Sequence, residues 1–233
     1  MTTISTIGAG NIPTAIARLA ASTGHRLLMT NSRGPHTLQE HVRSLGGHVE
    51  AVTMQDAVDA SDIVVLSVPL SAVRTLPSDL LDGKVVIDTV NYYPQRDGQV
   101  PELDTKHATT SQIVAGHFRG ARVVKGFNSI VHAHLAILGR PSRSPGRSAL
   151  PIASDDAAAK ALVGSLFDDL GYDAIDAGGL AESWRFERDQ PAYCLPYAAD
   201  RKAMLSREPG QPVPEGQQVT REQLLALLDE AVR

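Results

Sequence analysis

The sequence has few of the features that mark secreted, membrane or nucleic-acid-binding proteins. Cys194 is the only cysteine among 233 residues, which excludes an internal disulfide framework and a metal site with several cysteine ligands. No apolar run approaches the roughly 20 residues that span a bilayer. No basic residue precedes Arg18, so we expect no signal peptide. The 22 basic and 26 acidic residues leave a formal charge of -4, a poor match for nucleic acid or anionic membrane. We therefore expect a cytoplasmic globular protein without a membrane or nucleic-acid partner.

Short β-branched runs alternate with helical patterns through the first half of the chain. The run at residues 63–68 is almost continuously apolar, as expected for a parallel strand that is buried on both faces. We predict strands over residues 3–7, 26–30, 48–52, 63–68, 85–88 and 122–125, with helices over 11–22, 37–45 and 54–60. This alternation, without tight hairpin signals, predicts an α/β fold with a doubly wound parallel sheet of Rossmann type.

The character of the sequence changes after about Gly139. A loop over 139–147 carries three arginines, and we predict a strand over 149–153, a helix up to Leu170 and a strand over 172–176. A Pro- and Gly-rich linker over 208–218 precedes a final helix that begins at Thr220. We predict two regions, a Rossmann domain over 1–139 and a small α/β region over 140–233 for substrate binding or dimerisation. The leucines of the final helix need a cover, which favours a homodimer.

The strongest local signal is the segment Ile-Gly-Ala-Gly-Asn-Ile-Pro at residues 7–13. It follows a predicted strand directly and precedes a predicted helix, which is the setting of a dinucleotide fingerprint. The first glycine makes the turn, and the second lets the backbone approach a pyrophosphate at the helix N-terminus. Pro13 stands where the third glycine or alanine is usual, and its ring could crowd the contact between helix and strand.

A second signal, Asn31-Ser32-Arg33-Gly34, lies 21 residues beyond Gly10. An NAD-specific site usually has an acidic residue here to hold the ribose 2′-hydroxyl. This chain has a hydroxyl and a guanidinium instead, which suit a 2′-phosphate. The pattern therefore predicts NADP rather than NAD.

Three further segments leave predicted strands at the edge where ligands bind in parallel sheets. They are Ser67-Val68-Pro69, the stretch from Asp88 to Tyr93, and Lys125-Gly126-Phe127-Asn128. Their position predicts that they line a pocket, although Thr89 or Tyr92 could also cap or pack.

With these motifs the chain resembles the coenzyme F420-dependent NADP oxidoreductase family, and more specifically a bacterial branch of it. The resemblance rests on residues 8–12, 31–35, 63–69, 88–93, 124–128, 176–178 and 181–187 and covers most of the chain. Members pass a hydride between NADP(H) and the deazaflavin coenzyme F420. The resemblance implies a Rossmann fold and bound NADP(H), with coenzyme F420 or a flavin as the second substrate.

Carried over residue by residue, the resemblance gives each motif a part of the cofactor. Residues 9–12 would hold the pyrophosphate, Ser32 and Arg33 the 2′-phosphate, and Val90 with residues 126–128 would approach the nicotinamide. A basic residue four positions after the 2′-phosphate serine falls at His36. The complete set of expected cofactor contacts is Gly8, Ala9, Gly10, Asn11, Ile12, Asn31, Ser32, Arg33, His36, Ser67, Val68, Pro69, Ala72, Val90, Asn91, Gly126 and Asn128.

Hydride transfer between two stacked rings needs no obligate acid or base, so we assign no catalytic residue. A carbonyl or imine acceptor would need a proton donor, and Tyr92, Tyr93, Lys125 and His132 are then the candidates. No metal is expected, because His132 and His134 would not share a helix face.

Three functions stay open at this point. The first is a reductase of a deazaflavin, flavin or quinone-like ring. The second is a carbonyl or imine reductase similar to the pyrroline-carboxylate reductase or hydroxyacid dehydrogenase groups, which usually add an all-helical C-terminal domain. The third is a non-catalytic NADP(H)-binding sensor.

Overall fold

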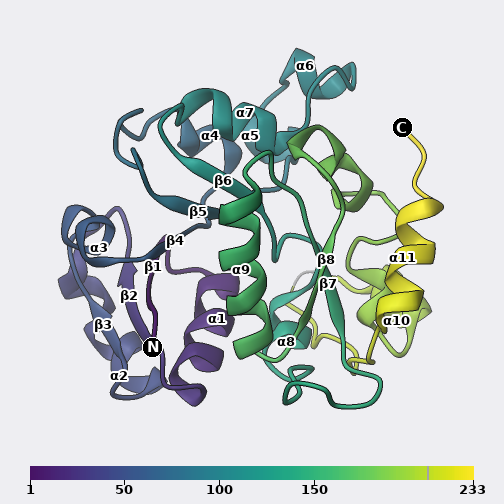
Figure 1. Cartoon of the computed structure of the whole chain (residues 1–233), viewed down its shortest axis with the longest axis horizontal. Helices are drawn as coiled ribbons and strands as arrows, with labels where there is room; N and C mark the ends of the chain where they lie inside the picture. The colour runs from purple at the N-terminus through teal and green to yellow at the C-terminus, as the bar shows by residue number, and fades with distance from the viewer. Residues whose placement is uncertain (209) are drawn as a thin grey trace.

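A six-stranded parallel sheet forms the first half of the protein (Figure 1). The computed structural model describes residues 1–208 and 210–233. The strands run in the order β3-β2-β1-β4-β5-β6, which is the strand order of a Rossmann dinucleotide-binding sheet. Their bounds are β1 (Thr3–Ile7), β2 (Arg26–Thr30), β3 (Val49–Ala51), β4 (Ile63–Leu66), β5 (Val85–Asp88) and β6 (Arg122–Lys125). The predicted fold class is confirmed.

Helices cover both faces of this sheet. They are α1 (Asn11–Ser22), α2 (Gln39–Leu45), α3 (Met54–Ala60), α4 (Leu70–Val73), α5 (Pro94–Asp97), α6 (Pro101–Asp104), α7 (Thr110–His117) and α8 (His132–Leu135). The helix predicted over 37–45 is in two parts, because a 3₁₀ turn over Pro35–Leu38 precedes α2. The strand predicted over 63–68 ends at Leu66, since the chain turns into Pro69 and α4.

A second, two-stranded parallel sheet follows, made of β7 (Ala149–Ile152) and β8 (Asp173–Asp176). Between them runs α9 (Ala157–Asp169), which lies in front of the junction of the two sheets (Figure 1). Lys125 at the end of β6 and Ala153 form an antiparallel bridge. Phe127 stacks on Phe167 of α9 with ring centroids 4.0 Å apart. The two predicted regions therefore pack on a common core, and the boundary at residue 139 stays a prediction.

The C-terminal helix α11 (Arg221–Asp229) is covered by its own chain. Leu224 and Leu228 are buried and α11 packs against β7 and β8. The chain itself thus supplies the cover that these leucines need, so the helix gives no support to a homodimer, which stays a prediction. The segment predicted as a linker over 208–218 includes residue 209, which lies outside the described residues. Its later part is anchored, since His134 Nε2 is 2.8 Å from the carbonyl oxygen of Pro214.

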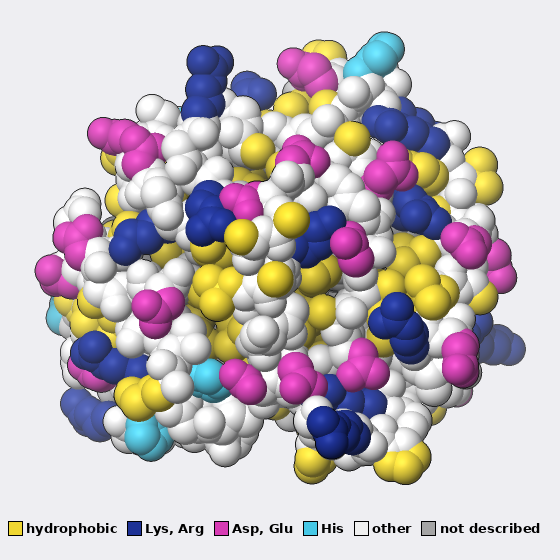
Figure 2. Space-filling model, viewed as in Figure 1, with side chains coloured by type: hydrophobic (Ala, Val, Ile, Leu, Met, Phe, Trp, Pro, Cys, Tyr) yellow, Lys and Arg dark blue, Asp and Glu magenta, His cyan; other side chains and the backbone are white. Residues whose placement is uncertain are grey.

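The surface carries both charge signs. On the face shown in Figure 2, Lys and Arg side chains alternate with Asp and Glu, and no large patch of one sign forms there. Nowhere in the described part of the chain does a helix combine the length and the apolar character needed to cross a membrane.

Candidate dinucleotide-binding site

The turn between β1 and α1 has the geometry of a phosphate cradle. Gly8 has a φ of +112°, and a Cβ on it would lie 2.2 Å from the carbonyl oxygen of Ser67. Only glycine allows this close approach of two strand-end turns. Gly10 differs, because a Cβ there would meet none of the described residues within 4 Å apart from its neighbours in the chain. The open space beside Gly10 is therefore where a ligand can approach the backbone.

The first turn of α1 is free to receive an anion. Gly10 is its N-cap and no side chain caps the helix. The backbone N–H groups of Asn11 and Ile12 belong to the first helical turn, whose donors have no partner within the helix. Pro13 is buried and leaves the helix intact, with Thr14 N–H donating to the carbonyl oxygen of Gly10 at 3.0 Å. Pro13 is tolerated because the missing N–H lies in this first turn.

The loop after β2 presents the two residues predicted for a 2′-phosphate. Asn31 shapes the loop: its Oδ1 accepts from the N–H of Arg33 at 3.0 Å and its Nδ2 donates to Thr37 Oγ1 at 2.9 Å. Ser32 and Arg33 are exposed, and neither side chain has a hydrogen bond or ion pair with another of the described residues. His36, also exposed, starts the following 3₁₀ turn with Pro35.

A cleft of about 400 Å³ opens at the carboxyl ends of β1, β4, β5 and β6. We call it the strand-end cleft. Of the residues predicted to bind cofactor, Asn11, Ile12, Ser67, Val68, Pro69, Val90, Asn91 and Asn128 line it. The others do not line it: Gly8, Ala9 and Gly10 lie in the turn between β1 and α1, Ala72 in α4, Gly126 directly after β6, and Asn31, Ser32, Arg33 and His36 after β2. An extended dinucleotide would have to span from the β2 loop to this cleft.

A buried ion pair supports the floor of the strand-end cleft. Lys125 and Asp88 are both fully buried, with Nζ 3.3 Å from Oδ2. Asp88 Oδ1 accepts from the N–H of Val90 at 2.8 Å, and Lys125 Nζ donates to the carbonyl oxygen of Val90. The pair thus fixes the peptide groups on both sides of a cleft residue. Lys125 itself does not reach the cleft, so in this structure it is a positioning residue and not a proton donor.

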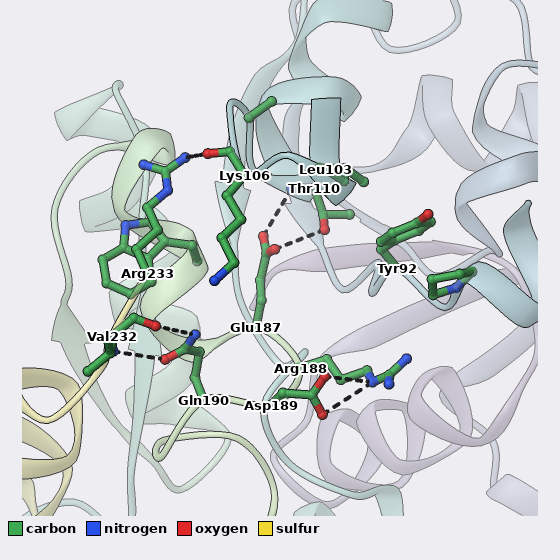
Figure 3. A pocket seen from close by; sticks show the side chains of 13 residues that line it. Tyr92, Leu103, Lys106, Thr110, Glu187, Arg188, Asp189, Gln190, Val232 and Arg233 are labelled. Atoms are coloured by element: carbon green, nitrogen blue, oxygen red, sulfur yellow. Dashed lines mark hydrogen bonds and ion pairs between the residues drawn. The ribbon is translucent and has the colours of Figure 1, made fainter. Parts of the chain in front are cut away.

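The two adjacent tyrosines face different hollows. Tyr93 lines the strand-end cleft. Tyr92 faces a second pocket of about 460 Å³ near the C-terminus, together with Lys106, Glu187 and Arg233 (Figure 3). The Tyr92 hydroxyl donates to Asp104 Oδ1 at 2.8 Å and accepts from the N–H of Val100 at 3.1 Å. Tyr92 is therefore occupied outside the cleft, and of the candidate acids only Tyr93 and His132 line it.

Part of the cleft lining comes from residues that the sequence did not indicate. Tyr193 and Cys194 line it, some 100 residues after Tyr93. Cys194 has a φ of +53° and Phe127 a φ of +57°, unusual values that are held here by the surrounding packing. Burial raises the pKa of the Cys194 thiol to about 12. No periodic pattern or motif in the sequence marks Tyr193 or Cys194.

His132 lines the strand-end cleft, whereas the arginine loop over 139–147 lies outside it. Burial and the nearby charge of Arg207 lower the pKa of His132, which favours its neutral form. In the arginine loop, Arg147 is buried and pairs with Asp168 and Asp173. The loop arginines Arg140, Arg143 and Arg147 do not line the strand-end cleft.

Comparisons with known proteins agree with this geometry. The model of the family described as NADP oxidoreductase, coenzyme F420-dependent, matches residues 3–92. The solved structure of the hypothetical protein SMa0349 from Sinorhizobium meliloti is 30% identical, with a TM-score of 0.73, and the match covers 84% of this chain and 94% of that one. Over residues 3–92 the chain belongs to the coenzyme F420-dependent NADP oxidoreductase family. This match confirms the predicted class, an NADP-dependent oxidoreductase.

More distant relatives share the fold. A structure from Arthrobacter sp. FB24, described as that of a proposed F420-dependent NADP reductase, is 24% identical with a TM-score of 0.63, over 77% of this chain and 86% of that one. Glycerol-3-phosphate dehydrogenase [NAD(P)+] of Chlorobium phaeobacteroides is 29% identical over 158 residues, 58% of this chain and 47% of that protein. The chain spans less than half the length of the curated relatives it matches, 43% and 47%.

Proposed function

We propose that the protein uses NADPH to reduce a planar ring acceptor, with a deazaflavin such as coenzyme F420 as the first candidate. The observation that carries the proposal is the combination of an uncapped α1 N-terminus with a free Ser32–Arg33 loop. Both sit at the edge of the sheet where parallel α/β folds bind ligands. One site offers a backbone cradle suited to the pyrophosphate of NADP, and the other offers a cation suited to its 2′-phosphate.

The residues around α1 and the β2 loop fit NADPH. The pyrophosphate would accept from the N–H groups of Asn11 and Ile12 beside the open face of Gly10. The 2′-phosphate would accept from the Arg33 guanidinium and the Ser32 hydroxyl. No acidic side chain stands at residues 31–34 to repel that phosphate.

The remaining end of the cofactor would reach the strand-end cleft. When bound there, NADPH supplies a hydride from its nicotinamide. The chain's part is to hold this ring and exclude water. Val90 is suited to that role because Asp88 and Lys125 fix its backbone, and Phe127 because it is stacked on Phe167.

The strand–helix–strand unit β7-α9-β8 disfavours the carbonyl or imine reductase alternative. Those groups usually add an all-helical C-terminal domain, and this chain folds differently after residue 149. A non-catalytic sensor would bind NADPH through the same turn and loop, so it is separated from a reductase by turnover alone.

The direct test is NADPH oxidation at 340 nm with coenzyme F420, with NADH, free flavin and no acceptor as parallel reactions. We expect turnover with NADPH and F420, much slower turnover with NADH, and none without acceptor. NADPH binding without turnover of any ring acceptor would contradict the reductase and favour the sensor. Absence of NADPH binding would contradict both.

A further inference from the structure

Two phenol groups meet in the wall of the strand-end cleft. The hydroxyls of Tyr93 and Tyr193 are 2.6 Å apart, a short hydrogen bond between residues 100 positions apart in the chain. Both residues line the cleft. Because a cleft wall can be built from apolar residues at lower cost, a paired hydroxyl at this place suggests a chemical role.

The surroundings of Tyr193 keep it protonated. Burial, followed by the neighbouring Cys194 and Tyr93, raises the pKa of Tyr193 far above its usual range. Either hydroxyl can donate in this pair. When Tyr193 donates, the proton of Tyr93 is not used in the pair and is available to a group in the cleft.

Two guanidinium groups lie close to the ring of Tyr93. The guanidinium of Arg96 lies 4.8 Å from the centre of the Tyr93 ring, and that of Arg188 lies 5.4 Å from it. Arg96 forms an ion pair with Asp97, which also accepts hydrogen bonds from the N–H of Tyr93 and from Ser71. Asp189 pairs with Arg188. Both guanidiniums are thus ion-paired, and Arg96 lines the strand-end cleft beside Tyr93.

We infer that Tyr93, with Tyr193 as its hydrogen-bond donor, is the acid that protonates the acceptor when the hydride arrives. The inference rests on the proposed function, because it requires a hydride donor in the strand-end cleft. It adds that the acceptor is one whose reduction places charge on an oxygen or nitrogen.

The reaction balances with these groups. The acceptor gains the hydride with its electron pair, and NADPH is oxidised to NADP+. The acceptor atom that becomes negative forms a bond to the proton while the O–H bond of Tyr93 breaks. Tyr93 is left as a phenolate that accepts the hydrogen bond of Tyr193, and it regains a proton from water at the open cleft.

The test uses Tyr93→Phe, with Tyr92→Phe as the matched control because Tyr92 faces the second pocket. The acceptor is coenzyme F420 or menadione, whichever the wild type reduces faster. We expect Tyr93→Phe to lower kcat roughly 10²-fold, the usual contribution of a general acid, with the Kd for NADPH unchanged. Tyr92→Phe should retain wild-type kcat. Tyr193→Phe keeps the Tyr93 acid but removes its donor, so its loss should be smaller, about 10-fold.

Chemical rescue separates a catalytic role from a structural one. A small buffer acid such as acetic acid should restore part of the Tyr93→Phe rate in proportion to its concentration, and should not affect Tyr92→Phe. Wild-type kcat in Tyr93→Phe, or a loss that no buffer acid restores, would overturn the inference while the proposed function stands. A wild type that binds NADPH but reduces neither acceptor would overturn both. If Tyr93→Phe unfolds, Tyr193→Phe must still show the smaller loss, and a wild-type kcat there overturns the inference.

Discussion

Gly8 and Ser67 approach each other so closely that the position of a side chain on Gly8 is already occupied. A Cβ on Gly8 would lie 2.2 Å from the carbonyl oxygen of Ser67, and the φ of Gly8 is +112°. The turns that follow β1 and β4 can therefore pack this closely only because Gly8 has no side chain. Gly10, two residues further, has open space where its Cβ would be.

This difference predicts that alanine lowers the stability of the fold at Gly8 and the affinity for NADPH at Gly10. Gly8→Ala should destabilise the fold by about 2–4 kcal/mol, because the Ser67 carbonyl must move and the backbone is strained. Gly10→Ala should leave stability within about 0.5 kcal/mol. It should weaken NADPH binding about 10-fold, since its methyl group enters the space expected for the pyrophosphate. Urea unfolding and fluorescence titration with NADPH measure both quantities. Wild-type NADPH affinity in Gly10→Ala would place the pyrophosphate elsewhere.

Arg33 determines the preference for NADPH if the β2 loop holds the 2′-phosphate. Charge-assisted hydrogen bonds contribute about 1.5–3 kcal/mol, so Arg33→Ala should raise the Kd for NADPH roughly 10- to 100-fold. The Kd for NADH should not change, since NADH has no 2′-phosphate. Arg43→Ala is the matched control, because Arg43 is also exposed and lies on α2 away from the strand-end cleft. Equal losses for NADPH and NADH in Arg33→Ala would contradict the assignment.

The sequence was sufficient for the sheet and for one side of the cleft. Apolar strand runs and the Gly8–Gly10 turn depend on local chemistry, and each parallel strand brings its following turn to the same edge. The segments after β1, β4, β5 and β6 were therefore placed correctly at one cleft.

The part of the cleft lined by Tyr193 and Cys194 depends on contacts between residues far apart in the chain. Tyr193 meets Tyr93 across 100 residues of sequence, and the N–H of the next residue, Cys194, donates to the carbonyl oxygen of Ser129 at 2.8 Å. No local pattern specifies these contacts. The sequence also did not predict that α11 packs on its own chain. The apolar face of a helix indicates that the helix is buried, but not which surface buries it. Tyr92 and Tyr93 are adjacent residues of the same type, so the sequence does not distinguish their roles. In the structure they line different pockets.

The Lys125–Asp88 ion pair predicts that the stability losses caused by substitutions at these two residues are not additive. Lys125→Met leaves a buried carboxylate without its cation, and Asp88→Asn leaves a buried ammonium without its anion. Each should cost about 3–5 kcal/mol of stability. The double variant should lose less than the sum of the two, because it leaves no uncompensated charge. Thermal unfolding of the four proteins completes the double-mutant cycle. Additive losses would contradict a direct pair.

Asp156 links stability to pH through the end of α9. It caps this helix by accepting from the N–H of Ala159 at 2.9 Å and pairs with Arg122 at 2.7 Å. The hydrogen bond from Arg122, followed by that of Ala159, holds the pKa of Asp156 well below its usual range. The stabilisation by Asp156 is therefore complete above its pKa in the unfolded state, about 3.9, and is lost as the pH falls towards its pKa in the folded state.

Asp156→Asn should lower Tm at pH 7, and the difference in Tm from wild type should narrow below about pH 4. Asp59→Asn, a change at an exposed aspartate without an ion pair, is the control. A difference in Tm that stays constant down to pH 2 would show that the charge of Asp156 contributes nothing.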